Sequence, residues 1–150
     1  MLPKAVLDPG IFNRWGPDFA VEHGLVLACN DGAVMTVGFG HRYPSVEVWS
    51  TSRVDQPWRV DDEGIDAVSD LLHAAHVAVS DDVPANEEWH YRPMGTGVPV
   101  PWRIILKLRT STLAGFEGGT KIYVNTISPT TLAAMLLPKL FEARAAGRIA

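Results

Sequence analysis

The triplet Asn30-Asp31-Gly32 separates two largely apolar runs, residues 21–29 and 33–39, and this arrangement is the strongest constraint on the fold. Asn, Asp and Gly tolerate the positive φ angles of tight turns, so the triplet predicts a β-hairpin. Residues 45–52 alternate between apolar and polar side chains, which predicts a third strand with one face buried. These strands follow a lead-in over residues 1–19, which is rich in Pro and Gly and is expected to be irregular.

A long helix is predicted over about residues 61–80. Asp61 and Asp62 can cap its start, because a carboxylate accepts hydrogen bonds from the first free N–H groups of a helix. Its apolar positions recur at helical spacing: Ile65, Val68, Leu71, Leu72, Ala75 and Val79. This helix separates the first group of strands from a second group.

The second half of the chain repeats the strand-then-helix order. Residues 86–92 and 101–109 alternate as strands, and a short strand is expected over 121–124. Ser128-Pro129 predicts the start of the final helix, since serine caps a helix and proline fits its first turn. Pro138 lies inside that helix and is predicted to kink or break it. The whole order predicts an α+β fold in which two helices pack on an antiparallel sheet.

Composition narrows the class of protein. A chain of 150 residues that is 47% hydrophobic can build one substantial core, so a single domain over 1–150 is expected. The formal net charge of −4 gives no basic field, so nucleic acid is not expected as a partner. Every strongly apolar stretch is shorter than the ~20 residues of a membrane span, so no membrane partner is expected. Cys29 is the single cysteine and no leader-like segment opens the chain, which favours a cytoplasmic location.

Five short motifs follow one another along the chain: Tyr43-Pro-Ser-Val-Glu47, Trp89-His90, Trp102–Arg109, Gly115-Phe116-Glu117 and Ser128-Pro129. In this order and spacing they resemble the C-terminal half of the galactose-1-phosphate uridylyltransferases, over about residues 20 to 145. That family belongs with the histidine-triad nucleotide enzymes, so the resemblance implies a histidine-triad-like α+β fold. The stretch from Ala114 to Asn125 is more similar to the related sugar-nucleotide phosphorylase branch.

The sequence lacks the motif that carries the family's chemistry. The nucleophile of these transferases lies in a His-Pro-His motif of the first half, and this chain contains neither that motif nor any His-x-His. Without the histidine, covalent nucleotidyl transfer has no attacking group, so no catalytic residue is predicted.

A metal site is also predicted to be lost. Many family members hold a structural metal with the histidine of Trp-His and with a His-x-His on the next strand. The corresponding residues are His90, Ile105 and Lys107. Isoleucine cannot bind a metal and an ammonium group repels a cation, so no metal or cofactor is expected. His90 is then either a histidine hydrogen-bonded within the sheet or part of a binding pocket.

The remaining candidates are binding residues. The resemblance implies that Glu117, after Gly115-Phe116, reaches sugar hydroxyls, because a carboxylate accepts hydrogen bonds from adjacent hydroxyls. A structural anchor of the loop is the alternative. Arg103, Lys107 and Arg109 alternate along one strand. They could form a phosphate-binding stripe or simply the solvated side of the sheet.

Two hypotheses follow. In the first, the chain is the non-nucleophilic half of a uridylyltransferase-like nucleotidyltransferase of carbohydrate metabolism, and it binds a sugar phosphate or nucleotide sugar. It would act with an N-terminal catalytic half or as a homodimer. In the second, it is a non-catalytic ligand-binding or protein-interaction domain that kept only the scaffold. The fold alone does not separate them.

Overall fold

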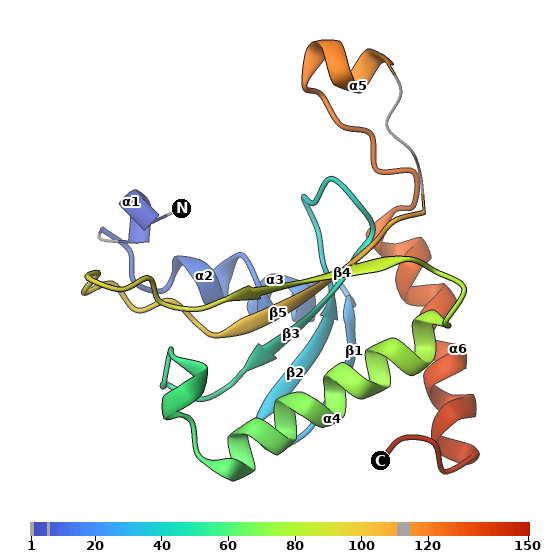
Figure 1. Ribbon diagram of the computed structural model, residues 1–150, viewed down its shortest axis with the longest axis horizontal. Helices are drawn as coiled ribbons and strands as arrows, with labels where there is room; N and C mark the ends of the chain where they lie inside the picture. The colour runs from blue at the N-terminus through green and yellow to red at the C-terminus, as the bar shows by residue number, and fades with distance from the viewer. Residues whose placement is uncertain (1, 6, 111–114) are drawn as a thin grey trace.

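A computed structural model of the chain describes residues 2–5, 7–110 and 115–150. Five strands in this part form one antiparallel sheet in the order β1-β2-β3-β5-β4. They are β1 (Val26–Cys29), β2 (Ala33–Val37), β3 (Ser45–Ser50), β4 (Ala85–His90) and β5 (Arg103–Leu108). Helices α4 (Asp62–Val79) and α6 (Pro129–Ala145) cover one face of the sheet (Figure 1). The predicted α+β class is confirmed.

The hairpin predicted at Asn30 joins β1 to β2. The Asn30 side-chain oxygen accepts hydrogen bonds from the N–H groups of Gly32, at 3.2 Å, and Ala33, at 2.8 Å. Its amide nitrogen donates to the Ala67 carbonyl oxygen at 2.8 Å, which ties the turn to α4. A polar residue at the turn therefore fixes both the hairpin and its distance from the helix.

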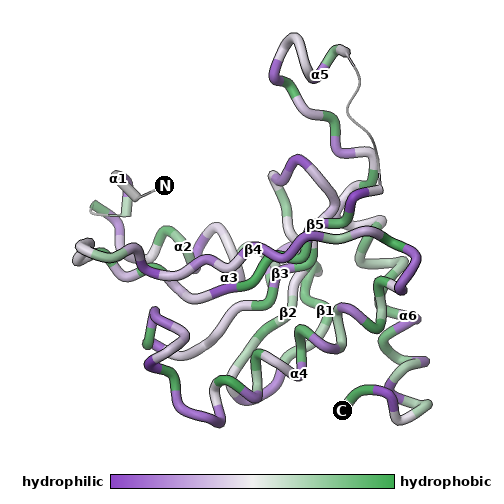
Figure 2. The backbone as a smooth tube through the Cα atoms, in the orientation of Figure 1, coloured by the Kyte–Doolittle hydropathy of each residue, from purple (hydrophilic) through white to green (hydrophobic). Residues whose placement is uncertain are grey.

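The main core lies between the sheet and the two long helices. Asp61 caps α4 by accepting a hydrogen bond from the Gly64 N–H group at 2.9 Å, as predicted. Val68, Leu71 and Ala75 of this helix pack with the inward-facing side chains of β2, β3 and β5. Leu132, Leu136 and Leu140 bring α6 into the same core. Figure 2 shows the edge strand β4 as a hydrophilic stretch beside the more apolar central strands.

The central strand differs from its prediction. Residues 45–52 were expected to bury one face, but all six residues of β3 are buried. The strand has partners on both sides, β2 and β5, and its second face is partly covered by the N-terminal segment. Gly16 lies so close to Trp49 that a Cβ atom placed on it would meet the indole ring at 2.6 Å.

The lead-in is not irregular. It contains three short helices: α1 (Leu2–Ala5), α2 (Ile11–Arg14) and α3 (Pro17–Glu22). Ile11 and Phe12 bury their side chains with Ala5 and Val100 in a small second cluster. Burial of these apolar side chains holds the short helices in place, although none is long enough to be stable alone. Because α3 runs to Glu22, the first strand begins at Val26 and not at 21.

The glycine-rich segment also departs from its prediction. Residues 115–120 form a helix, α5 (Gly115–Thr120), and the strand expected over 121–124 is absent. Thr120 Oγ1 donates to the Phe116 carbonyl oxygen at 2.7 Å, and Lys121 Nζ donates to that of Gly118 at 2.8 Å. Lys121 has a φ of 61°, which ends any extended run there. We call residues 115–125 the arm, since they project away from the sheet (Figure 1).

The final helix, α6, continues through Pro138. Ser128 caps it through a hydrogen bond from the Thr131 N–H group at 3.1 Å, as expected, but the break expected at Pro138 does not occur. Pro138 lies on the exposed side of α6, so the Ala134 carbonyl group that loses its partner can meet water. Buried Leu136 and Leu140 hold the turns on either side. No described helix combines the length and apolarity that crossing a membrane requires.

Candidate functional site

The face of the sheet that points away from α4 and α6 is rich in polar groups. Strand alternation and the register of the pairs place the following side chains on it: Thr36, Ser45, Glu47, Trp49, Glu88, His90, Arg103, Ile105 and Lys107. We call these residues the polar sheet face. Thr36, Ser45 and Glu47 are nearly inaccessible to solvent, with exposed fractions of 2%, 0% and 6%. Burying polar groups costs free energy unless they find partners, so this face is the candidate site.

Glu47 is the buried carboxylate at the centre of the polar sheet face. Its Oε1 atom pairs with the His41 Nε2 atom, and His41 reaches it from the loop between β2 and β3. Gly38 makes this approach possible, because a Cβ atom there would lie 2.7 Å from the His41 ring and 3.1 Å from Glu47 Oε1. The pairing supplies the partner that a buried carboxylate needs.

Arg103 lies beside this pair on β5. Its guanidinium carbon is 4.3 Å from the centre of the Trp49 ring, in cation–π contact. Burial lowers the pKa of Arg103, and the Glu47 carboxylate opposes that shift. The Arg103 Nε atom is buried and has no hydrogen-bond partner among the described residues. A buried donor without a partner can donate a hydrogen bond to a carboxylate or phosphate oxygen.

His90, Glu88 and Lys107 form the other part of the polar sheet face. Lys107 Nζ donates to Glu88 Oε1 at 2.6 Å, and this hydrogen bond is the main reason that the pKa of Glu88 is lowered. His90 Nε2 lies 3.4 Å from Glu88 Oε2. Burial and then the charge of Arg103, which is the register partner of His90, lower the pKa of His90. The imidazole is therefore held mainly neutral at pH 7.

The structure gives a physical reason for the expected loss of the metal site. Ile105 is buried where a ligand would be needed, and the Lys107 ammonium group takes up the carboxylate of Glu88 next to His90. Within residues 2–5, 7–110 and 115–150, no group of three or more His, Cys, Asp or Glu side chains could hold a metal ion. The metal content of the protein itself stays a prediction.

Not all of the predicted site residues lie close together in the structure. Arg103, Lys107 and His90 share the polar sheet face, whereas Arg109 follows the end of β5 and is exposed. Gly115, Phe116 and Glu117 belong to α5, which stands apart from the sheet (Figure 1).

The arm is nevertheless attached near the site. The guanidinium carbon of Arg42 lies 4.0 Å from the centre of the Tyr123 ring and 5.2 Å from that of Tyr43. The Asn125 amide donates to the carbonyl oxygen of His41 at 3.4 Å. The loop that carries His41 to Glu47 therefore also anchors the arm.

Sequence reasoning did not single out His41, Glu47 or Trp49 as site residues. The alternation of Val46, Glu47 and Val48 predicts a carboxylate on the open face of the strand, so it gives no local sign that Glu47 is buried. A buried carboxylate needs a partner. Nothing local marks His41 as that partner, because the contact depends on how the loop folds back.

A model of the family described as "Domain of unknown function (DUF4921)" matches residues 3–150. No curated protein matches the chain in sequence.

Two solved structures share the fold. One is an ADP-glucose phosphorylase from Arabidopsis thaliana, solved with bound ADP-glucose, with a TM-score of 0.68 and 20% identity over 81% of this chain. The other is a GalT-like protein from Arabidopsis thaliana, with a TM-score of 0.68 and 21% identity over 81% of this chain. The match covers 45% of the first protein and 47% of the second, so the chain spans about half the length of these relatives. The fold is that of galactose-1-phosphate uridylyltransferase-like proteins, which confirms the resemblance seen in the motifs.

Proposed function

The chain belongs to the family described as a domain of unknown function, DUF4921, and from that premise we propose that it binds a sugar phosphate or nucleotide sugar without supplying a nucleophile. It would be the non-nucleophilic part of a GalT-like nucleotidyltransferase, acting with an N-terminal catalytic half or a second copy. A cytoplasmic setting accompanies this proposal, because Cys29 has no second cysteine with which to form an internal disulfide.

Arg103 carries the proposal. Its guanidinium group is largely removed from water, yet its Nε atom has no hydrogen-bond partner within the described residues. Glu47 is already paired with His41, so its carboxylate by itself does not neutralise the charge of Arg103. A phosphate oxygen would provide both the missing acceptor and a countercharge, and arginine is well suited to phosphate because of its planar set of donors.

The neighbours of Arg103 limit what can bind. Glu88 is held by Lys107, which leaves Arg103 and the neutral His90 as the groups that face a ligand on this part of the sheet. A neutral imidazole can donate a hydrogen bond to a sugar hydroxyl or accept one from it. The solved ADP-glucose phosphorylase with bound ADP-glucose has the same fold, and this likeness supports a sugar-nucleotide class of ligand.

The roles of the arm residues stay predictions. To contact sugar hydroxyls, Glu117, with Gly115 and Phe116, would have to reach a sugar that is bound at the polar sheet face of this chain or at the sheet of a partner. Glu117→Ala should then weaken binding of the sugar phosphate without altering binding of inorganic phosphate.

An NMR titration tests the proposal. Galactose-1-phosphate, glucose-1-phosphate and UDP-glucose are added to the chain, and shifts are expected at residues 88–107. We expect a dissociation constant of roughly 0.1–1 mM, about −4 to −5.5 kcal/mol, since only part of a full pocket is present. Arg103→Met should abolish these shifts, and Arg109→Met, a matched change at an exposed position, should leave them in place. If millimolar ligand causes no shifts at residues 88–107, the proposal is wrong.

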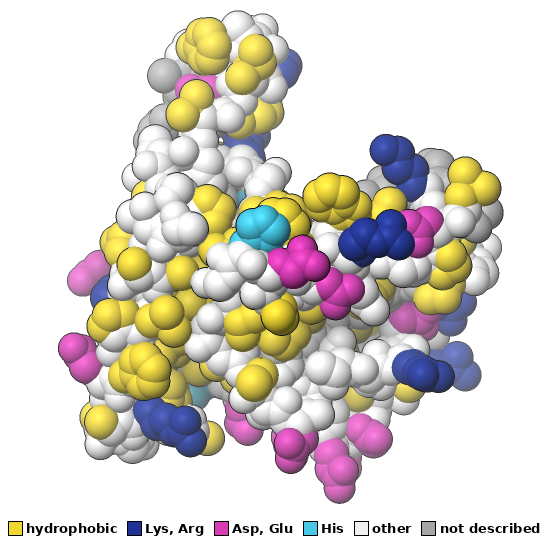
Figure 3. Space-filling model, turned by 180° about the vertical axis from the view of Figure 1, so that it is seen from behind, with side chains coloured by type: hydrophobic (Ala, Val, Ile, Leu, Met, Phe, Trp, Pro, Cys, Tyr) yellow, Lys and Arg dark blue, Asp and Glu magenta, His cyan; other side chains and the backbone are white. Residues whose placement is uncertain are grey.

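One observation favours a second function, a protein-interaction domain. Phe116, Ile122 and Val124 of the arm have exposed fractions of 59%, 60% and 55%. Figure 3 shows hydrophobic side chains gathered on the projecting arm. Clustered exposed apolar groups are typical of surfaces that meet another protein. A chain that binds none of the three ligands but forms a complex through the arm would support this alternative.

A further inference from the structure

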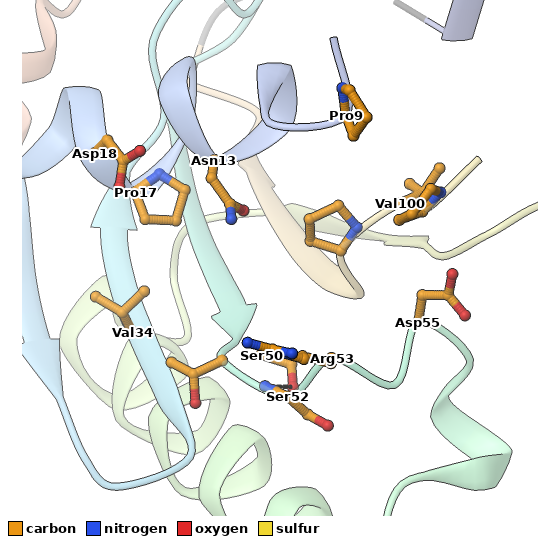
Figure 4. A pocket seen from close by; sticks show the side chains of 13 residues that line it. Pro9, Asn13, Pro17, Asp18, Val34, Ser50, Ser52, Arg53, Asp55 and Val100 are labelled. Carbon is orange, nitrogen blue, oxygen red and sulfur yellow. Dashed lines mark hydrogen bonds between the residues drawn. The ribbon is translucent and has the colours of Figure 1, made fainter. Parts of the chain in front are cut away.

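A cavity lies at the end of the sheet remote from the arm. Its volume is about 530 Å³. It is bordered by α2 and α3 on one side, by the last residue of β3, Ser50, and the segment after it on the other, and by Pro99–Pro101 (Figure 4). The Ala33–Ser50 end of the β2–β3 pair borders it, whereas the arm is anchored at the loop joining the opposite end of that pair. Its volume lies within the range of small-molecule sites.

Polar groups face one another across this cavity. Asn13 and Asp18 approach from the N-terminal helices, and Ser52 and Arg53 from the segment after β3 (Figure 4). The Ser52 hydroxyl oxygen accepts a hydrogen bond from the Val54 N–H group at 3.1 Å, which leaves its own O–H free to donate. None of the side chains of Asn13, Asp18 and Arg53 forms a hydrogen bond or ion pair with another described residue. The walls thus offer both hydrogen-bond donors and acceptors.

Charge decides which class of ligand fits. Arg53 brings one positive charge to the lining, while Asp18 and Asp55 bring two carboxylates. Asp55 is neutralised by Arg92, whose Nε atom lies 2.8 Å from it. The lining therefore has no excess positive charge. The attraction of a phosphate group to Arg53 would be offset by its repulsion from the Asp18 carboxylate.

The rest of the lining supports a neutral ligand with many hydroxyls. Pro17, Pro101 and Val34 provide apolar C–H surface, which suits the apolar face of a pyranose ring. None of the residues lining the cavity is aromatic, so a nucleobase would lack the stacking that usually holds it. A carboxylate such as that of Asp18 can accept hydrogen bonds from two adjacent hydroxyls, and an amide such as that of Asn13 can both donate and accept.

We propose that this cavity is a binding site for a neutral carbohydrate, with Asp18, Asn13, Ser52 and Arg53 as its polar contacts. The site is separate from the polar sheet face and does not depend on the function proposed above. It does not need a phosphate group.

Titration of the chain with glucose, galactose and, separately, inorganic phosphate tests the proposal by amide NMR. Sugars at tens of millimolar should shift residues 13–18 and 50–55, and phosphate should not. Asp18→Asn should weaken sugar binding by about tenfold, because a charged hydrogen-bond acceptor is lost. Glu22→Gln, a matched change on α3 outside the cavity, should have no effect.

Three results would overturn the proposal: no shifts at residues 13–18 and 50–55 with either sugar, shifts there with phosphate alone, or equal weakening by Asp18→Asn and Glu22→Gln. Arg53→Ala provides a second variant, since Arg53 is exposed and its loss should not unfold the chain. Shifts confined to residues 88–107 would concern the polar sheet face instead, so the two proposals fail separately.

Discussion

Lys107 and Glu88 form an ion pair across the β4–β5 strands, with Lys107 Nζ 2.6 Å from Glu88 Oε1. Asn86, and not Glu88, is the direct register partner of Lys107, so the contact is diagonal. The pair lies on the polar sheet face beside His90, and in it Lys107 binds the carboxylate that is nearest to that histidine. The Lys107 ammonium group therefore disfavours a metal ion at this position and lowers the pKa of Glu88.

The first prediction concerns metal content. The chain should purify without stoichiometric iron or zinc, because Lys107 places a positive charge next to Glu88 and Ile105 offers no ligand atom. Elemental analysis after purification without chelators measures this. About one metal ion per chain would show that the correspondence drawn for Ile105 and Lys107 is wrong.

The second prediction concerns the titration of His90. Its imidazole should titrate below the ordinary value of 6.5, since burial and the charge of Arg103 both lower its pKa. Arg103→Met should raise the pKa of His90, because it removes the second of these causes. NMR of the imidazole protons against pH measures both values.

The same shifts set the sign of the dependence of stability on pH. A folded-state pKa of His90 below 6.5 means that the unfolded chain takes up this proton first, so stability falls as the pH drops below about 6.5. Glu88 also has a lowered folded-state pKa, so its contribution is present above its ordinary value of 4.5 and is lost as the pH falls through the folded value. Both groups therefore favour the folded state at neutral pH. Urea unfolding at pH 7.5 and 5.0, chosen as roughly a unit above the His90 reference value and near that of Glu88, should give a lower midpoint at the acid pH.

The fourth prediction concerns packing between the N-terminal segment and the sheet. Gly16→Ala should reduce the free energy of unfolding by about 1–3 kcal/mol, because the new Cβ atom would lie 2.6 Å from the Trp49 ring and 2.7 Å from the Phe12 carbonyl oxygen. Gly97→Ala is the matched control, since nothing lies within 4 Å of a Cβ atom there. Denaturant unfolding should separate the two variants. Equal midpoints would mean that the segment around Gly16 can move away from Trp49 without loss of stability.

Much of the fold could be predicted from local patterns. The turn at Asn30 and the caps at Asp61 and Ser128 depend on residues close in sequence, and all three were predicted correctly. The strands 86–92 and 101–109 were predicted slightly too long, at ends that adjoin Pro93 and Pro101. Proline has no N–H group to donate to a neighbouring strand, so pairing stops near it.

The site could be predicted only in part. His90, Arg103 and Lys107 lie on strands whose alternation is visible in the sequence, but their mutual contacts depend on the β4–β5 register. The His41–Glu47 pair depends on a loop that folds back over the sheet, and no local period marks such a contact. The helical turn at Gly115–Thr120 was missed because glycine disfavours helices, and it is held instead by side-chain hydrogen bonds of Thr120 and Lys121.

The last prediction concerns how the arm is held. Tyr123→Ala removes the ring that lies 4.0 Å from the guanidinium carbon of Arg42, while Tyr43 stays at 5.2 Å. A cation–π contact of this kind contributes about 0.5–2 kcal/mol, and α5 has no buried side chain of its own to compensate for the loss. Hydrogen exchange measured by mass spectrometry should therefore become faster in residues 115–125 and stay unchanged in the β2–β3 strands. Ile122→Ala is the control, since Ile122 is adjacent and 60% exposed, and it should leave the exchange of the arm as it is. Unchanged exchange in Tyr123→Ala would mean that the Asn125–His41 hydrogen bond, at 3.4 Å, holds the arm alone, and faster exchange in both variants would mean that apolar contacts of the arm hold it instead.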